Sequence, residues 1–225
     1  MSLQVFNELE QGTDEWLAAR CGIVTASVVG QLITPKTIKP AVNDTSRGLV
    51  ATLAAERITG HVEQVFPNRD MERGTLDEPY ARDLYSEHFA PAGEVGFMVR
   101  DDWGFKLGYS PDGLVGDDGL IEIKSRNQKK HLQTILADEV PAENLAQCHA
   151  GLLVSGREWI DYTSYCGGMP LYVKRVYPDI RWHLAIKEAV EAFEEAAAQM
   201  IKNYGINTSG RPSTERIDHY AEMVF

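Results

Sequence analysis

The first ninety residues are dominated by apolar positions that recur every three or four residues, a spacing typical of helices. We predict helices over residues 13–20, 25–33, 47–59 and 69–90. Thr13 is the expected N-cap of the first helix, and Gly22 and Gly60 follow the first and third as stop signals. Residues 34–46 are rich in turn formers and are predicted to be a loop, and Pro79 predicts a kink or a restart in the fourth helix.

The spacing of the apolar positions changes after residue 93. Residues 94–124 alternate short apolar stretches with Asp and Gly turns, which predicts a meander of three antiparallel strands. Farther along we predict helices over 127–138 and 142–154, strands over 157–166 and 171–177, and a long amphipathic helix over 179–204 that ends at Gly205. This order indicates an α/β (α+β) domain with a mixed central β-sheet flanked by helices.

One predicted hairpin carries charges on a strand that should be buried. It is the segment "SPDGLVGDDGLIEIK", residues 110–124. Residues two apart in a strand share a face, so Glu122 and Lys124 point to the same side. The side to which Asp112 points depends on the turn, because a slip of one residue inverts the face.

Two turns are compatible with this hairpin. A two-residue turn at Asp118 and Gly119 would place Asp112 on the face opposite Glu122 and Lys124. We predict instead a three-residue loop that ends with Gly119 at positive φ, which puts all three charges on one face. The register predicted for this loop pairs Gly116 with Leu120, Leu114 with Glu122, and Asp112 with Lys124.

Two carboxylates and an ammonium in one patch suit metal chemistry. The oxygens of Asp112 and Glu122 are ligands that Mg²⁺ accepts while it keeps room for water and phosphate, and the carbonyl of Ile123 can face the same ion. A lysine beside the ion, here Lys124, can orient or deprotonate a bound water. The alternative interpretation is the ordinary solvent-exposed face of a hairpin.

Composition changes this picture little. The 225 residues suit one domain over 1–225, with a helical part to about residue 90, sheet and helices over 91–205 and a tail over 206–225.

The net charge of −11 by itself argues against a nucleic-acid partner. A basic run at 124–131 opposes that argument, although it is also compatible with a solvated helix start. Its basic residues are Lys124, Arg126, Lys129 and Lys130.

Several classes of protein are excluded. Cys21, Cys148 and Cys166 are scattered, so we expect free buried thiols instead of disulfides or a structural zinc site. The HExxH motif of zinc hydrolases is missing from the sequence. The sequence has no apolar run of membrane-spanning length and no basic, then apolar, leader, so we expect a cytoplasmic protein without membrane contact.

Motifs along most of the chain resemble one nuclease family. They are "EQGTDEWLAARCGIVTAS" at 10–27, "MERGTLDEPYARDLYSE" at 71–87, "SPDG" at 110–113, "EIK" at 122–124, and a later helix carrying Gln147. In type and order they resemble the phage lambda exonuclease family, also called YqaJ-type viral recombinases, within the PD-(D/E)xK nuclease superfamily. The resemblance covers about residues 8–200 and implies a restriction-endonuclease-like core.

The resemblance implies roles at the hairpin and on the helix before it. Asp112 and Glu122, helped by the Ile123 carbonyl, would bind Mg²⁺, for which Mn²⁺ can substitute, and Lys124 would serve the attacking water. Glu78 would help to hold a second metal ion or its water. The alternative for Glu78 is an ordinary surface residue of a helix.

The resemblance also implies a pocket for a terminal 5′-phosphate, formed by Arg20, Ser27, Ser110 and Gln147. A guanidinium binds phosphate in a bidentate manner, and Ser27 near a helix N-terminus adds donors where the dipole favours anions. The competing interpretations are that Thr25 and Ser27 are only helix caps and that Ser110 only ends a strand.

Three further residues are weaker candidates for DNA contact. Trp16 and Trp103 could stack on bases or wedge between them, but core packing is the favoured interpretation. Arg47 could contact a phosphate. The chain departs from helicase-linked relatives, which often carry Gln-x-x-x-Tyr and sometimes an iron–sulfur cluster: Gln147 is followed by Gly151, and three cysteines are too few for the cluster.

The function implied by the resemblance is a Mg²⁺-dependent exonuclease that digests one strand of linear duplex DNA from its 5′ end and leaves a 3′ single-stranded tail. Family members form a ring-shaped homotrimer and act beside a beta-type single-strand annealing recombinase. An acidic exterior around a positive channel would reconcile the net charge with DNA binding. The alternatives are a PD-(D/E)xK endonuclease or repair nuclease, and a non-catalytic module that binds DNA ends.

Overall fold

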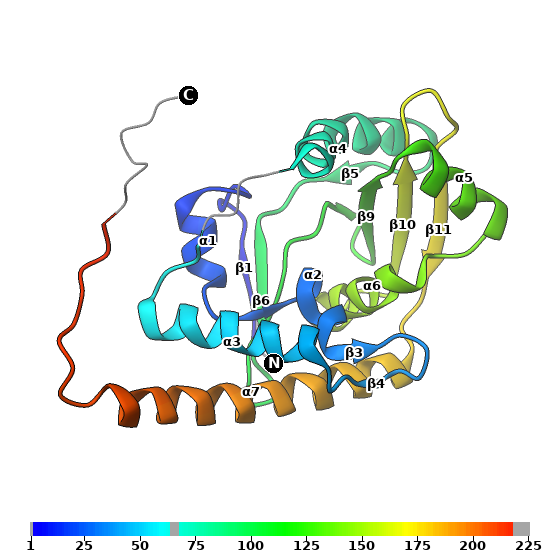
Figure 1. The fold of residues 1–225 in the computed structure, drawn as a ribbon. Coiled ribbons are helices and arrows are strands. Elements are labelled where there is room, and N and C mark those ends of the chain that lie inside the picture. The colour runs from blue at the N-terminus through cyan, green and yellow to red at the C-terminus, as the bar shows by residue number, and fades with distance from the viewer. Residues whose placement is uncertain (1, 64–67, 218–225) are drawn as a thin grey trace.

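The computed structural model of the protein describes residues 2–63 and 68–217 and has a mixed α/β architecture, as predicted (Figure 1). The helices are α1 (Asp14–Arg20), α2 (Ala26–Val29) with a following 3₁₀ turn (Gly30–Leu32), α3 (Asp44–Thr59), α4 (Arg69–His88), α5 (Gln128–Ala137), α6 (Ala142–Ser155) and α7 (Ile180–Thr208). The strands are β1 (Leu3–Phe6), β2 (Val24–Thr25), β3 (Ile33–Thr34), β4 (Lys39–Pro40), β5 (Ala92–Gly93), β6 (Phe97–Arg100), β7 (Leu107–Tyr109), β8 (Gly113–Val115), β9 (Gly119–Ser125), β10 (Trp159–Tyr165) and β11 (Tyr172–Val176).

The strands form two main sheets and a small hairpin. One sheet has the order β11-β10-β9-β8-β5, with β9 and β10 parallel and the other neighbours antiparallel, so it is the predicted mixed sheet. The second sheet has the order β1-β6-β7-β2, and β3 pairs with β4. Helix α4 lies over β9 and β5, on the opposite side of the molecule from α3 and α7 (Figure 1).

The predicted three-stranded meander over 94–124 is wrong. This region contains four strands, of which β6 and β7 belong to one sheet and β8 and β9 to the other. The chain crosses between the sheets at residues 110–112. Pro111 has no N–H group to continue a ladder, which explains why the pairing is interrupted there. Asp112 therefore lies at the crossing between the two sheets.

The register predicted for the β8–β9 hairpin is also wrong, although its loop does have three residues. The observed pairs are Gly113 with Ile121, Leu114 with Leu120, and Val115 with Gly119. The loop begins one residue earlier than predicted, and Gly116 takes the positive φ, +52°. Gly119 is needed inside the strand, because a Cβ atom there would lie 2.2 Å from the Trp159 ring. The register differs by two positions, so the face of Asp112 is unchanged.

Helices α3 and α4 differ in detail from the prediction. Helix α3 begins at Asp44, because Asn43 and Ser46 form a reciprocal capping box, and the preceding residues form the β3–β4 hairpin instead of a loop. Helix α4 passes through Pro79 as one element.

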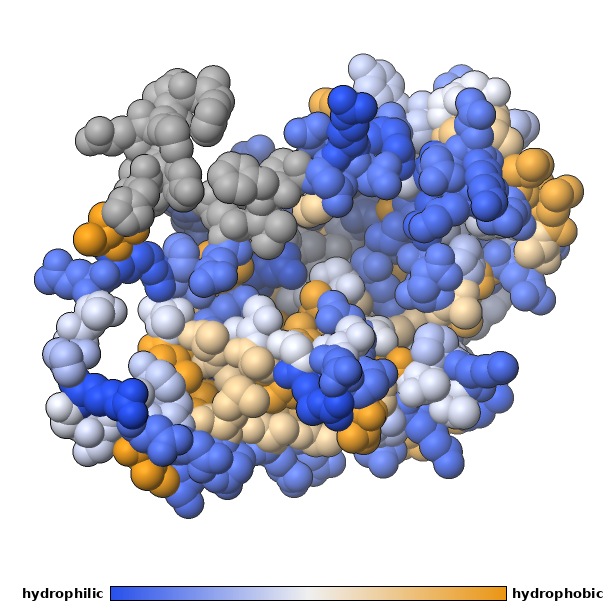
Figure 2. Space-filling model, in the orientation of Figure 1, coloured by the Kyte–Doolittle hydropathy of each residue, from blue (hydrophilic) through white to orange (hydrophobic). Residues whose placement is uncertain are grey.

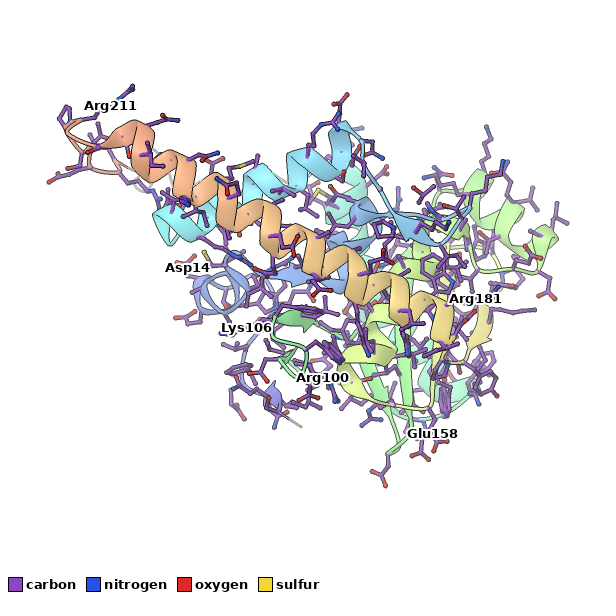
Figure 3. All side chains as sticks on the ribbon, turned by 90° about the horizontal axis from the view of Figure 1, so that it is seen from below. Asp14, Arg100, Lys106, Glu158, Arg181 and Arg211 are labelled. Atoms are coloured by element: carbon purple, nitrogen blue, oxygen red, sulfur yellow. The ribbon has the colours of Figure 1, made fainter. Side chains whose placement is uncertain are left out.

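The prediction ended helix α7 at Gly205, but the helix continues through this glycine to Thr208. A glycine in an exposed helix costs only about 1 kcal/mol relative to alanine, so it need not end a helix this long. Figure 3 shows α7 crossing the lower side of the molecule, with Arg181 near its start and Arg211 beyond its end. None of the helices in the described ranges combines the length and the apolar run needed to cross a bilayer.

Helix α6 is the central element of the core. It packs against β6 and β7 of one sheet, β10 of the other, and helices α2 and α7. Its apolar residues are buried on several sides, as expected for a helix surrounded by other elements. The three cysteines are free thiols; Cys148 on this helix and Cys166 are buried, whereas Cys21 is only half-buried. The position of α6 brings Gln147 to the junction of the two sheets.

Candidate active site

A cleft of about 530 Å³ opens where the two sheets meet. Figure 2 shows the surface hollowed between α4 and α2. Every residue that the sequence predicted for catalysis, metal binding or the 5′-phosphate pocket lines this cleft. They are Arg20, Ser27, Glu78, Ser110, Asp112, Glu122, Ile123, Lys124 and Gln147. The fold therefore brings together segments that lie up to 127 residues apart in the chain, from Arg20 to Gln147.

Asp112 and Glu122 form the acidic centre of the cleft. The Asp112 Oδ2 atom accepts a hydrogen bond from the Ile123 backbone N–H at 2.6 Å. Glu122 is fully buried. Burial, reinforced by the negative charge of Asp112, raises the pKa of Glu122 to about 7, and burial also raises the pKa of Asp112. Both carboxyl groups are thus harder to ionise than in water, because their surroundings do not fully compensate a negative charge.

Lys124 lies beside this pair. Its Nζ atom donates to Glu122 Oε1 at 2.5 Å, and its side chain is 25% exposed. Burial opposes the charged form of Lys124, but the Glu122 and Asp112 carboxylates outweigh that effect and raise its pKa. Lys124 is therefore an ammonium at neutral pH that can donate hydrogen bonds into the cleft.

Glu78 reaches the cleft from α4. Its carboxylate accepts a hydrogen bond from Arg82, one helical turn later. Burial, followed by repulsion from Asp112, raises the pKa of Glu78 to about 7, although Arg82 acts in the opposite direction. Glu78 is thus a functional candidate that interacts with the acidic pair, and the interpretation as an ordinary surface residue does not describe its surroundings.

The donor atoms fit a hard divalent cation with few protein ligands. In residues 2–63 and 68–217, no group of three or more His, Cys, Asp or Glu side chains is arranged to hold a metal. Mg²⁺ does not need such a group, because one or two carboxylates suffice when water and phosphate complete its shell. Asp112 and Glu122 supply two carboxylates whose raised pKa values would fall beside a cation.

The Ile123 carbonyl is the third candidate ligand. The N–H and C=O groups of one strand residue point to the same neighbouring strand. Since the Ile123 N–H meets Asp112, its carbonyl faces the same side. Continuing the β8–β9 register places Pro111 opposite Ile123, and proline has no N–H to donate to that carbonyl. The set of Asp112, Glu122 and the Ile123 carbonyl therefore suits Mg²⁺.

The sequence did not predict two residues that contact these acids. Tyr109 lies at the end of β7, with its hydroxyl 3.4 Å from Glu122 Oε2. Its ring occupies the space beside Gly151, where a Cβ atom would lie 2.8 Å from it. Arg82 contacts Glu78 and the Asp112 carbonyl. The four-residue spacing from Glu78 to Arg82 is a helical ion-pair signal that was visible in the sequence, whereas nothing local pointed to Tyr109.

A second polar cluster lies in the same cleft. Arg20 Nη2 donates to Thr25 Oγ1 at 3.3 Å, and the hydroxyls of Thr25 and Ser27 are 3.0 Å apart. Burial lowers the pKa of Arg20, an effect that Glu56 partly offsets, but a guanidinium stays charged. Thr25 makes no side-chain capping bond to α2, so its hydroxyl is not used as a simple helix cap.

Trp16 joins this cluster to the acidic centre. Its Nε1 atom donates to Ser110 Oγ at 2.9 Å, and the Arg20 guanidinium lies 4.1 Å from its ring centroid. Trp16 is buried, so the interpretation as a packing residue describes most of its side chain. Gln147, the remaining phosphate candidate, instead donates to Glu122 Oε1 at 2.5 Å.

Other candidates for DNA contact lie elsewhere. Arg47 does not line the cleft, and it pairs with Asp44 at 2.5 Å on the surface of α3. Trp103 packs against the main core next to Phe105. The basic run is divided, because Arg126 bonds to Asn144 and Tyr162 in the interior. Its remaining members outside the cleft, Lys129 and Lys130, are exposed on α5.

Comparisons with known proteins agree with this geometry. Residues 15–158 match the sequence model of the YqaJ-like viral recombinase domain. The crystal structure of LHK-Exo, an alkaline exonuclease from Laribacter hongkongensis, is similar with a TM-score of 0.78 and 33% sequence identity, over 88% of this chain and 98% of that chain. The structure of LHK-Exo in complex with dAMP gives a TM-score of 0.79, with the same identity and coverage.

A phage-related exonuclease from Haemophilus somnus 129PT shares the fold, with a TM-score of 0.64 and 15% identity over 81% of this chain and 96% of that chain. A comparison with functionally curated proteins gives no match. The family match spans more than half of the chain, and it agrees with the motifs and with the cleft that they line. The chain therefore belongs to the YqaJ-like viral recombinase family of nucleases.

Proposed function

We propose that the protein is a Mg²⁺-dependent exodeoxyribonuclease that digests one strand of linear double-stranded DNA in the 5′-to-3′ direction. It releases mononucleotides and leaves a 3′ single-stranded tail for recombination by strand annealing. The observation that carries this proposal is the arrangement of the cleft. The polar cluster of Arg20 and Ser27 shares one cleft with Asp112, Glu122 and Lys124.

The acidic centre is proposed to perform the hydrolysis. Asp112, Glu122 and the Ile123 carbonyl would hold Mg²⁺, with Glu78 supporting a second ion or its water. Mg²⁺ held by these residues would polarise a phosphoryl oxygen and acidify a water molecule. Lys124 donates a hydrogen bond to Glu122, and we propose that it also orients the attacking water.

The polar cluster is proposed to determine where cleavage begins. Arg20 can bind a terminal phosphate in a bidentate manner, and the hydroxyls of Ser27 and Ser110 can donate to its oxygens. LHK-Exo has been solved with dAMP, a nucleotide that carries such a phosphate. Gln147 can take part only if it exchanges its bond to Glu122 for one to the phosphate.

We further propose the assembly and partners that the resemblance implies. The substrate is duplex DNA with a free 5′ end, the active form is a homotrimeric ring, and the partner is a beta-type single-strand annealing recombinase. With a net charge of −11, only the cleft and the DNA path need to be positive. Sedimentation equilibrium of the purified protein tests the trimer.

One experiment tests the activity, its direction and the phosphate preference together. Linear duplexes with a 5′-phosphate or a 5′-hydroxyl, labelled at either end, are incubated with the protein and Mg²⁺. We expect mononucleotides from the 5′-labelled strand, faster release from the phosphorylated duplex, and an intact covalently closed circle. Cleavage of the circle would instead indicate an endonuclease, and binding without any nucleotide release would indicate a DNA-end binding module.

A further inference from the structure

Arg82 on α4 connects three segments at the edge of the cleft. Its Nε atom donates to the Asp112 backbone carbonyl at 2.7 Å, its Nη2 atom donates to Glu78, and its Nη1 atom donates to Glu94. The side chain is only 11% exposed. One guanidinium therefore ties the helix that carries Glu78 to the crossing segment that carries Asp112.

The crossing segment needs such support. Residues 110–112 lie between β7 of one sheet and β8 of the other, so Asp112 belongs to neither ladder. Asp112 is held from two sides instead. Its carboxylate meets the Ile123 N–H on β9, and its carbonyl meets Arg82 on α4. Arg82 thus holds the main chain at Asp112, whereas the Ile123 N–H holds its carboxylate, the group that we propose binds the metal.

The chemistry of arginine suits this task. The guanidinium is planar and permanently charged, and its N–H groups diverge in a fixed fork, so one side chain can fix several acceptors at once. A lysine at the same place would offer a point charge on a flexible stem. The positive charge of the Arg82 guanidinium also lies beside Glu78, and it reduces the repulsion between Glu78 and Asp112.

We propose that Arg82 is a positioning residue, which fixes Asp112 and Glu78 relative to each other so that a divalent cation meets prearranged ligands. This inference rests on the proposed metal-dependent nuclease function. Arg82 is not among the residues that line the cleft, so the role that we assign to it acts through Asp112 and Glu78. A role limited to stability is the competing explanation, because the same side chain also anchors the segment at Glu94.

Arg100 is a matched control for that explanation. Its Nε atom donates to the Val154 carbonyl at 2.6 Å, its Nη1 atom donates to Asp102 at 3.1 Å, and its side chain is 13% exposed. It thus joins a backbone carbonyl and a carboxylate as Arg82 does, but it does not line the catalytic cleft. Substitution at either arginine should lower stability to a similar extent.

The test uses the full chain with Arg82→Gln, Arg82→Lys, Arg100→Gln and Arg100→Lys. Thermal unfolding monitored by circular dichroism reports stability, and isothermal titration calorimetry with Mn²⁺ in the absence of DNA reports metal binding. Mutation of residues that orient metal ligands typically weakens metal affinity about 10- to 100-fold, so we expect this range for Arg82→Gln. We expect a smaller loss for Arg82→Lys, and affinities within about twofold of the wild type for both Arg100 variants.

Steady-state kinetics on linear duplex adds a second readout. The Arg82 variants should lower kcat and require more Mg²⁺ for half-maximal rate, while KM for DNA changes little. Wild-type Mn²⁺ affinity in folded Arg82→Gln would overturn the inference. If that variant does not fold, an unchanged affinity in Arg82→Lys would overturn it, as would equal losses in the Arg82 and Arg100 variants. A wild type that neither binds Mn²⁺ nor releases nucleotides would refute the proposed function itself.

Discussion

The carboxylate of Asp112 accepts a hydrogen bond from the backbone N–H of Ile123 at 2.6 Å. This bond joins the segment that crosses between the sheets to the strand that carries Glu122 and Lys124. Asp112, Glu122 and Ile123, which offer three oxygen donors from these two segments, all line the same cleft. The arrangement separates two roles of Asp112, because the hydrogen bond needs only an acceptor oxygen whereas a metal needs the charge.

Asp112→Asn should therefore keep the fold and lose the metal. The asparagine carbonyl oxygen can still accept from Ile123, but the neutral amide is a poor Mg²⁺ ligand. We expect Mn²⁺ affinity measured by calorimetry to fall at least about 10-fold. The control is Asp138→Asn, since Asp138 is an exposed acid paired with Lys174. Equal Mn²⁺ affinities in both variants would remove Asp112 from the metal site.

Lys124→Ala should cripple hydrolysis while leaving the protein folded. Loss of a group that transfers or orients a proton typically reduces the rate about 10²- to 10⁴-fold. Single-turnover release of nucleotides from a 5′-phosphorylated duplex measures this step. Lys129→Ala is the matched control, because Lys129 belongs to the same basic run but is exposed on α5. Full activity in Lys124→Ala would contradict the assigned role.

Glu122 should make the stability of the metal-free protein depend on pH. The folded protein releases the Glu122 proton at about pH 7, whereas the ordinary pKa is 4.5. Between these values the folded state holds more protons than the unfolded state, so stability falls as the pH rises through this window. Glu122→Gln cannot titrate and should remove this contribution.

The measurement is the free energy of urea unfolding for wild type minus Glu122→Gln, without divalent ions, from pH 4 to pH 9. This difference should decline between about pH 4.5 and pH 7 and stay level above. Taking the difference cancels titrations away from the site, such as that of buried His149, whose pKa is lowered to about 4. A difference that does not vary with pH would show that Glu122 ionises normally.

Arg20→Ala should abolish the preference for a 5′-phosphate. A half-buried guanidinium that bonds to Thr25 and stacks on Trp16 is prearranged to bind an anion, and its loss removes a bidentate contact. The ratio of initial rates on 5′-phosphorylated and 5′-hydroxyl duplexes should fall to about 1, while Mn²⁺ affinity is retained. Arg47→Ala is the control, since Arg47 lies outside the cleft. A ratio unchanged from the wild type in Arg20→Ala would exclude this pocket.

The apolar patterns predicted the helices but missed several short strands, and the errors have physical reasons. The prediction missed the start of α3, because that start depends on one capping box. It ended α7 too early, because a long helix tolerates a glycine. The predicted meander failed at Pro111, because a missing N–H group ends a ladder without revealing which strand pairs next. Pairing between strands is decided by partners far away in the chain.

The candidate site was also predicted in part from local patterns, whereas its assembly depends on contacts between distant segments. The two-residue period placed Glu122 and Lys124 on one face, and the predicted three-residue loop added Asp112. This result survived an error of two positions in register because faces repeat every second residue. Motif resemblance added Arg20, Ser27, Ser110, Gln147 and Glu78. All of these residues line one cleft in the structure.

The sequence by itself determined the chemical types of the site residues, their order along the chain and the face that they share. These properties follow from local backbone geometry, which neighbouring residues dictate. Only the tertiary structure decided that Glu122 is fully buried, that Tyr109 fills the space beside Gly151, and that Arg82 reaches Asp112. Burial and contacts of this kind join residues from separate elements, and they exist only once the two sheets and the helices around them have packed.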